Sequence, residues 1–243
     1  MGVRRLAPDL ARGVGYRPGP LRLVTHGELS ALVSDVSADD EAESEGRALR
    51  RDLRAHENVV RQAMEHGTIL PVSFGTVFDS DRQLVEELLE PGASELTAML
   101  RRFDGLVEVT LKVDFIEQAI MARLLERDPE LRAWRDSARF GGSDEQVAFG
   151  QALAETIEDE AVVYAERLVS QLQDQAEDVR VADPGRGTAV LKASALVDRR
   201  RLAELDQTVA ELAKSTGALL QFDYVGPLPP YSFVNLTLRS PAF

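Results

Sequence analysis

The order of apolar segments in the second half of the chain limits the possible folds most strongly. Residues 107–113 alternate β-branched or leucine side chains with polar ones, which predicts a strand. Helical periodicity follows over 116–139 and 143–177, and a second strand is predicted over 189–197. A helix from Asp198 to Gly217 and strands over 219–225 and 233–238 complete the order. This order predicts an α+β layer with one mostly antiparallel sheet and helices on one face.

The two long helical patterns of this half should pack against each other. Pro129 bends or breaks the first, and Phe140-Gly141-Gly142 turns the chain before a capping box at Ser143. In the second, apolar and small residues recur at near-heptad spacing, which is typical of a coiled-coil seam. We therefore expect an antiparallel helical hairpin over about 115–177. Its seam should comprise Val147, Gly150, Ala154, Ile157, Ala161, Tyr164 and Leu168.

The first half of the chain has the same kinds of element in shorter form. Two short strands are predicted over 21–24 and 31–36, and a helix over 47–66. Gly67 should end this helix in a left-handed conformation, which glycine adopts without steric cost. Alternating apolar residues then predict a strand over 69–78.

The division between the halves is predicted at Asp104-Gly105. Before it, a capping box at Ser80 begins a helix that should reach about residue 103, with an interruption near Pro91-Gly92. The chain is therefore predicted to contain two small α+β units, over 1–104 and 105–243. The units share element types, as a pseudo-repeat would, but no residue-level repeat is apparent.

Composition excludes several classes of function. The net formal charge is 28 − 41 = −13, so the protein repels nucleic acid and anionic lipid, and no basic run offsets this charge. The absence of cysteine excludes disulfides, thiolate nucleophiles and cysteine metal sites. No secretory signal or spanning apolar stretch is evident. The sequence favours a soluble intracellular protein that binds neither nucleic acid nor membrane.

His56 is the residue that most resembles part of a catalytic or metal centre. His56-Glu57 begins like a zinc-protease motif, but Val60 stands where the second histidine would be. His66 follows ten residues later, about 1000° around a helix, so the two rings project roughly 80° apart. No nucleophile elbow, phosphate loop or distinctive carboxylate pair accompanies them. We expect no catalytic, cofactor-binding or metal-binding residue, and we expect His56 to be a hydrogen-bonded member of an apolar helix stripe.

Two motifs together resemble one known family. After His56, residues 69–78 read ILPVSFGTVF, similar to the "His … LPLRFGTVF" signature of the GvpL/GvpF gas vesicle proteins. Residues 226–234 read GPLPPYSFV, similar to the family's "GPWPPYSFV" ending. The resemblance covers roughly residues 20–240. The resemblance marks the motif positions as structural. These positions are His56, Leu70, Pro71, Phe74, Gly75, Thr76, Phe78, Gly226, Pro227, Pro229, Pro230, Tyr231 and Phe233.

The chain departs from the family pattern at three places. The family's tyrosine-rich first strand of the "YVYGI" kind is not found in Met1 to Leu6. Either the chain starts late, or its N-terminal domain lacks a strand and has an open sheet edge. Ser73 stands where the family usually has Arg, and Leu228 where it usually has Trp.

Predicted strands flank residues 226–231, so we expect a rigid connection between strands there rather than a ligand for a proline-recognition domain.

The resemblance implies a function as well as a fold. Members of the family resemble two-domain α+β proteins with ferredoxin-like elements and a helical hairpin, and they are not enzymes. They are minor components needed to assemble the hollow protein shell that gives microbes buoyancy. The resemblance thus implies a location in gas vesicles within the cytoplasm, binding to the small shell protein GvpA and to other accessory proteins, and no cofactor.

Holding apolar shell subunits would require exposed apolar side chains. Candidate contact residues are Trp134, Phe140 and Phe149 on the helical hairpin and Leu228 in the proline-rich segment, with Tyr164 and Tyr231 as further candidates. Two alternatives stay open: a metal-dependent or small-molecule enzyme on a ferredoxin-like scaffold that uses His56 and nearby carboxylates, and a ligand-binding module. An open cleft with a perturbed carboxylate would favour the enzyme, and an apolar pocket with a few polar groups would favour the binding module.

Overall fold

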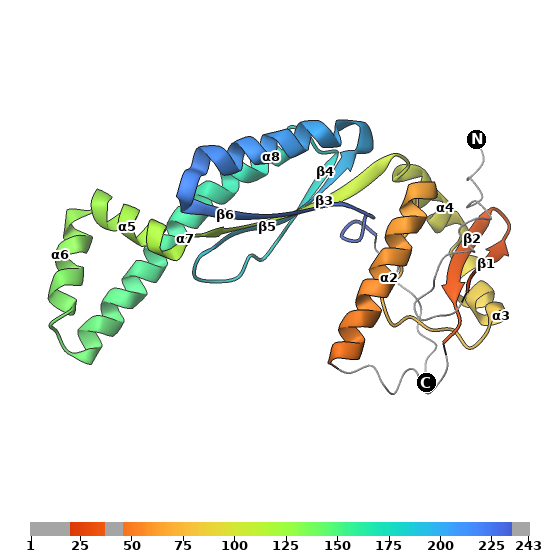
Figure 1. Cartoon of the computed structure of the whole chain (residues 1–243), viewed down its shortest axis with the longest axis horizontal. Coiled ribbons are helices and arrows are strands. Elements are labelled where there is room, and N and C mark those ends of the chain that lie inside the picture. Colours follow the sequence, from red (N-terminus) through yellow and green to blue (C-terminus); the bar gives the residue numbers. More distant parts are fainter. Residues whose placement is uncertain (1–19, 37–45, 235–243) are drawn as a thin grey trace. The chain divides into compact units, whose positions relative to one another are not determined.

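The chain is divided into two compact units. The computed structural model describes residues 20–36 and 46–234 (Figure 1). One unit comprises residues 1–107 together with 228–243, and the other comprises residues 108–227. The division predicted from the sequence, after Asp104, assigned residues 228–243 to the second unit instead of the first. The two units are described separately below.

The first unit contains a hairpin, a long helix and a broken helix. β1 (Leu21–His26) pairs antiparallel with β2 (Leu29–Ser34), and Gly27 turns the hairpin with a φ of 58°, which favours glycine. The helices are α2 (Arg47–His66), α3 (Asp81–Leu84), the π-helical η2 (Val85–Leu89) and α4 (Ala93–Arg102). The Ser80 hydroxyl accepts a hydrogen bond from the Gln83 amide, which confirms Ser80 as the N-cap, whereas the Gln83 side chain accepts from the amide of Asp79 rather than from that of Ser80. The two short strands and the helix over 47–66 are likewise confirmed.

A single apolar cluster joins the hairpin to the broken helix. Val24 and Leu29 of the hairpin are buried against four leucines, which are Leu84, Leu88, Leu89 and Leu96. Full burial of one such side chain stabilises the fold by about 1.5–3 kcal/mol. This cluster therefore fixes the hairpin against the α3–α4 region.

Residues 67–80 form no strand, so the strand predicted over 69–78 is wrong. The segment is irregular, turns at Phe74-Gly75 and belongs to no sheet. Gly67 is extended, with a φ of 163°, rather than left-handed as predicted, whereas Gly75 has a φ of 87°. Alternation predicted the strand, but a strand also needs a neighbour for its backbone hydrogen bonds. In the described part of the chain, no strand pairs with this segment.

The second unit is a four-stranded sheet with helices on one face. Its strands lie in the order β4-β5-β3-β6, and β4 pairs antiparallel with β5. α7 (Ser143–Gln173) and α8 (Leu202–Thr216) cover the same side of this sheet (Figure 1). The strands are β3 (Leu106–Phe115), β4 (Asp178–Ala182), β5 (Ala189–Asp198) and β6 (Leu220–Leu228), with short helices η3 (Arg199–Arg201) and η4 (Gly217–Leu219) at the ends of α8.

This arrangement confirms the predicted α+β class and most of the predicted elements. The sequence missed β4, a strand of five residues that follows directly after α7. The element order β-α-β-β-α-β is that of the ferredoxin-like motif. The ferredoxin-like classification of the two units stays a prediction.

The core of the second unit lies between the sheet and its helices. Alternate residues of a strand point to the same face, and on that face β3 and β5 carry Val109, Leu111, Val113, Phe115, Leu191, Ala193, Ala195 and Val197. Ile120 of α5 (Glu117–Arg127) and Leu205 of α8 are fully buried against them. The helices therefore depend on the sheet for most of their buried contacts.

An antiparallel helical hairpin extends from this core, as predicted. α5 ends at Asp128, whose carboxylate accepts hydrogen bonds from the next backbone amides and begins α6 (Pro129–Ala138). Arg127 pairs with Glu160, Trp134 stacks edge-on with Phe149, and the Ser137 hydroxyl donates to Glu145. From pair to pair, the residue number increases in the first helical segment and decreases in α7, as expected for antiparallel helices.

The buried face of α7 differs in part from the predicted seam. Ile157, Ala161 and Leu168 are buried as expected, but Val147 is 59% exposed, and Gly150 and Ala154 are also exposed. The N-terminal half of α7 has mainly α6 beside it, so this part of the seam lacks a second partner. The capping box predicted at Ser143 is wrong, because Gly142 is the N-cap and makes no side-chain hydrogen bond. The buried face instead comprises Leu153, Ile157, Ala161, Leu168 and Leu172.

Truncation of a buried α7 side chain should destabilise the second unit. Leu172 is 2% exposed, and we expect Leu172→Ala to lower the free energy of unfolding by about 2–5 kcal/mol. Val162 lies on the same helix but is 58% exposed, so Val162→Ala should change it by no more than about 0.5 kcal/mol. Urea denaturation followed by circular dichroism measures both. Equal effects of the two substitutions would contradict the assigned buried face.

Candidate functional site

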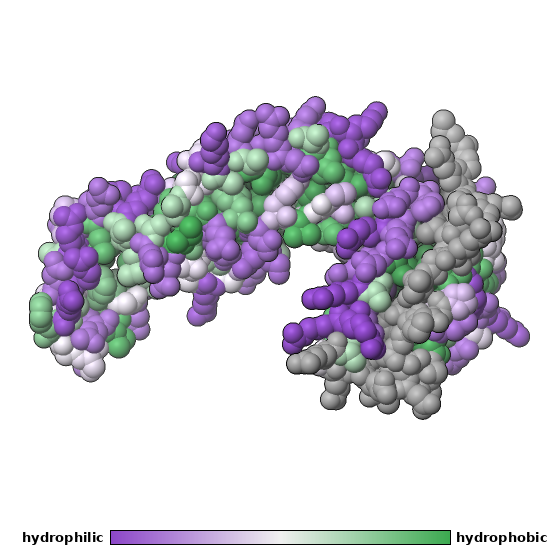
Figure 2. Space-filling model, viewed as in Figure 1, coloured by the Kyte–Doolittle hydropathy of each residue, from purple (hydrophilic) through white to green (hydrophobic). Residues whose placement is uncertain are grey.

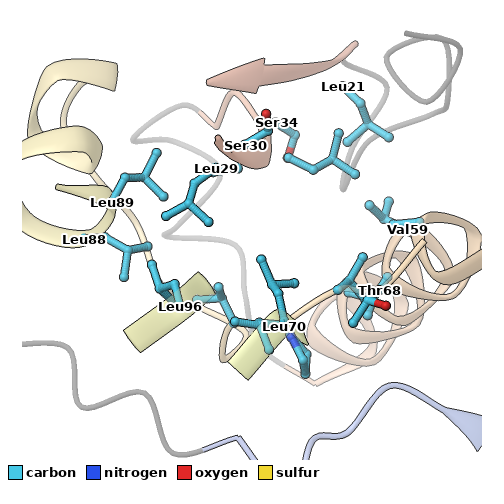
Figure 3. Close-up of a pocket in the computed structure, with 18 of the residues that line it drawn as sticks. Leu21, Leu29, Ser30, Ser34, Val59, Thr68, Leu70, Leu88, Leu89 and Leu96 are labelled. Carbon is cyan, nitrogen blue, oxygen red and sulfur yellow. The ribbon is translucent and has the colours of Figure 1, made fainter. Parts of the chain in front are cut away.

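An apolar cavity of about 240 Å³ lies within the first unit. Its walls come from β2, α2, the irregular segment 68–72 and the helices η2 and α4. Figure 3 shows Leu29, Ser30 and Ser34 on one side of the space and Thr68 and Leu70 on the other. Most of the lining side chains are aliphatic, so the cavity suits an apolar group.

His56 brings the most distinctive polar group to this cavity. Its ring is half-buried, forms a hydrogen bond with the backbone of Val72 and meets the Phe74 ring edge-on, with the ring centroids 5.6 Å apart. The buried Nε2 has no hydrogen-bond partner within the described residues. Burial lowers the pKa of His56, although the hydrogen bond to Val72 and the charge of Glu57 act in the opposite direction. The hydrogen-bonded position on the apolar stripe of α2 agrees with the sequence-based expectation.

The described surroundings of His56 contain no set of metal ligands. Among the described residues, no group of three or more histidine or acidic side chains is placed to hold a metal ion. The carboxyl group with a clearly displaced pKa is Asp198, lowered to about 2 by hydrogen bonds from Arg200, and it belongs to the other unit. The geometry around His56 therefore supports uptake of an apolar group more than proton transfer.

The first family motif lies at the cavity. Leu70 and Pro71 line it, and Phe74 covers the His56 ring. The Thr76 hydroxyl and amide both donate to the Ser73 carbonyl, which closes the turn around Gly75. Phe78 packs against the apolar cluster of the hairpin and the broken helix. Ser73, which stands where the family usually has Arg, is exposed.

The second motif comprises the end of β6 and a compact turn that follows it. The Gly226–Pro227 peptide bond is cis, and a Cβ at Gly226 would lie 2.6 Å from Cγ1 of Val109, so this position requires glycine. The amides of Phe233 and Val234 donate to the Pro230 carbonyl, and that of Tyr231 donates to the Pro229 carbonyl. Phe233 and Val234 therefore lie in a turn rather than in the strand predicted over 233–238. Residues 235–238 of that prediction lie outside the described residues.

The candidate contact residues differ greatly in exposure. Phe140, at the tip of the helical hairpin, is 89% exposed, whereas Trp134 is 37% exposed and packs on the half-buried Phe149. Tyr164 lies edge-on to Phe115 in the core, and Leu228 is half-buried at the end of β6. Figure 2 shows hydrophobic residues interrupting the hydrophilic surface of α5, α6 and α7. Phe140 is thus the candidate most accessible to a partner.

Sequence reasoning identified part of the cavity and missed the rest. His56, Leu70 and Pro71 were found through the first motif. Ser30 and Ser34 of β2 were not found, because nothing in a short alternating strand indicates which side chains border a cavity. The cavity also depends on the irregular path of residues 68–72, which the sequence predicted as a strand.

Comparisons with known proteins agree with the motifs. Residues 3–235 match the family described as "Gas vesicle synthesis protein GvpL/GvpF". The chain is 33% identical over 231 residues to gas vesicle protein F of Streptomyces sp. (strain CB03234), covering 94% of this chain and 93% of that protein. It is 31% identical over 245 residues to gas vesicle protein L of the same strain, covering 94% and 88%.

Solved structures of gas vesicle proteins share this fold. The crystal structure of GvpF from Anabaena sp. PCC7120 superposes with a TM-score of 0.77 at 21% identity, covering 100% of this chain and 96% of that one. GvpF from Microcystis aeruginosa gives a TM-score of 0.71 at 25% identity, covering 90% of each chain. Fold and sequence together thus place this chain in the class of gas vesicle proteins. Within it, the chain belongs to the GvpL/GvpF family.

None of the helices within residues 46–234 is both long enough and apolar enough to cross a bilayer.

Stability should depend on pH through His56. The folded state holds the pKa of His56 below its ordinary value of 6.5, so the unfolded state takes up a proton more readily as the pH falls below 6.5. Stability should therefore decrease from pH 7.5 to pH 5.5, and this contribution should be absent in His56→Gln. Thermal unfolding of both proteins at the two pH values measures the difference. An identical pH dependence in the variant would show that His56 is not the responsible group.

Proposed function

We propose that this protein is a non-enzymatic accessory or minor structural component of gas vesicle assembly. The observation that carries the proposal is its membership of a family described by gas vesicle synthesis, over nearly the whole chain. Relatives named gas vesicle protein F and L support the same role. The protein would act in gas vesicles within the cytoplasm.

The mechanism we propose is binding of apolar protein surfaces. The partners are the small shell protein GvpA and other gas vesicle accessory proteins, held until they join the growing shell. Two features support this mechanism: the exposed Phe140 at the tip of the helical hairpin and the apolar cavity of the first unit. Trp134, Phe149 and Leu228 are more enclosed, so we assign them a smaller part in the contact than Phe140.

An enzyme that uses His56 has less support. The ring faces an apolar cavity, and its pKa is displaced mainly by burial rather than by a carboxylate. One feature favours the ligand-binding alternative: the cavity combines aliphatic walls with polar groups from Ser30, Thr68 and His56. An apolar protein segment satisfies that chemistry as well as a small molecule does.

A pull-down against gas vesicle proteins tests the proposed function. The tagged full-length chain, co-expressed with the shell protein and the other vesicle proteins, should retain at least one of them. Phe140→Asp places a charge on an exposed apolar side chain, so it should reduce retention at least tenfold without unfolding the protein. Val162→Asp, at an exposed position of α7 away from the tip, is the matched control and should retain its partners.

The outcomes separate the role from the contact residue. Retention of no vesicle protein by the intact, folded chain would overturn the assembly role. Equal retention by the wild type and both variants would keep that role but remove the hairpin tip from the interface.

A further inference from the structure

One face of α7 continues beyond the sheet that the helix covers. The second unit lies entirely within the described part of the chain, and in it Ile157 and Ala161 of α7 belong to the core formed with the sheet. Val147, Gly150 and Ala154 continue the same three-and-four-residue spacing towards the N-terminus, so they share that helix face. All three are exposed, Val147 by 59%. These three positions form the free face of α7, in the half of the helix that lies past the end of the sheet (Figure 1).

α6 supports this half of α7 from another side. Phe149 meets the Trp134 ring edge-on, with the ring centroids 5.8 Å apart, and Glu145 accepts a hydrogen bond from the Ser137 hydroxyl. At about 100° per residue, Ala154 lies roughly 140° around the helix from Phe149. The contacts with α6 therefore hold the helix in place and leave the free face uncovered within the second unit.

The side chains of the free face suit a second helix. Gly150 and Ala154 project little from the backbone, so a partner helix can approach closely and insert large apolar side chains beside them. Val147 adds an apolar contact at one end. The three-and-four-residue spacing is the repeat with which helices meet, whereas a strand presents one face at every second residue. Residues 143–156 are about 20 Å long, which accommodates about three to four turns of a partner helix.

The charge around the free face specifies the partner further. Residues 143–162 contain six acidic side chains and no basic one. Glu158 lies one turn beyond Ala154, and neither Glu158 nor Glu155 forms an ion pair with any described residue. These carboxylates attract lysine and arginine. They disfavour a second copy, which would bring the same acidic face, and they disfavour an anionic lipid surface.

We propose that the free face of α7 binds one amphipathic helix of another protein, whose apolar stripe is flanked by lysine or arginine. Large apolar side chains of that helix would pack over Gly150 and Ala154 and against Val147, while its cations pair with Glu155 and Glu158. Recognition of an amphipathic helix through its apolar stripe is a common mode of peptide binding. This inference rests on the proposed binding function and assigns to it a surface and a partner chemistry.

A pair of designed peptides tests the partner chemistry. Each consists of three heptads with leucine at positions a and d and alanine at b, c and f, and the two differ only in lysine or glutamate at e and g. The fluorescein-labelled lysine peptide should bind the full-length chain saturably in a fluorescence anisotropy titration. The glutamate peptide should bind at least tenfold more weakly. Added salt should weaken binding of the lysine peptide, because it screens the charges.

Two variants of the protein locate the contact. Ala154→Arg places a long cationic side chain on the free face, so it should weaken binding of the lysine peptide at least tenfold. Ala210→Arg makes the same change at an exposed position of α8 and should alter binding less than twofold. Both variants gain the same charge, so their difference separates docking on the free face from general attraction to an acidic protein.

A charge reversal gives a second comparison that leaves the small side chains in place. Glu158→Lys should weaken binding at least threefold, whereas Glu166→Lys, at an exposed position in the C-terminal half of α7, should alter it less than twofold. Hydrogen exchange of the wild type, measured by mass spectrometry, should slow within residues 143–158 when the lysine peptide is bound. Thermal unfolding checks that each variant is folded.

Four results would overturn the proposal: no saturable binding of the lysine peptide, equal binding of the two peptides, equal loss in Ala154→Arg and Ala210→Arg, or slower exchange only outside residues 143–158. A wild-type dimer in sedimentation equilibrium that Ala154→Arg dissociates would assign the face to a second copy instead.

The pull-down keeps this inference separate from the proposed function. If Ala154→Arg retains gas vesicle proteins as the wild type does and the lysine peptide does not bind, the proposed function stands and the helical partner is rejected. If the intact, folded chain retains no vesicle protein, the proposed function fails whatever the peptides do.

Discussion

The need of a strand for a backbone partner explains the contrast between the two units. In the second unit β3 lies between β5 and β6, so its amides and carbonyls are paired inside the sheet and its apolar residues are covered by helices. In the first unit the described sheet has two strands, and the segment after α2 has a strand-like sequence without a strand partner among the described residues. The cavity, the irregular path of residues 68–72 and the half-buried His56 all lie along this segment.

The same constraint decides which parts of the fold could be predicted from the sequence. The long alternation of 107–113 and the helical periodicity of 47–66 and 198–217 were sufficient, because each element has its own apolar face and its own end signals. Pro129 marked the break between α5 and α6 for the same local reason. The strand over 69–78 failed because its formation depends on a partner strand, which local alternation cannot reveal.

Packing partners also explain the errors within α7. Leu153 and Leu172 are buried because of what lies beside them, whereas the near-heptad spacing of Val147, Gly150 and Ala154 occurs where the helix has mainly α6 for a neighbour. For the candidate site, the motif supplied His56 and Leu70, but the serines of β2 required the three-dimensional arrangement. A periodic pattern identifies an apolar face, and the tertiary neighbours determine how much of that face is buried.

The first family motif supplies one wall of the cavity. Leu70 and Pro71 line it, and Phe74 covers the ring of His56. The same contacts that form this wall remove the His56 ring from water, and burial disfavours the charged form of the ring. The packing of the motif and the neutral state of His56 therefore favour each other in the first unit.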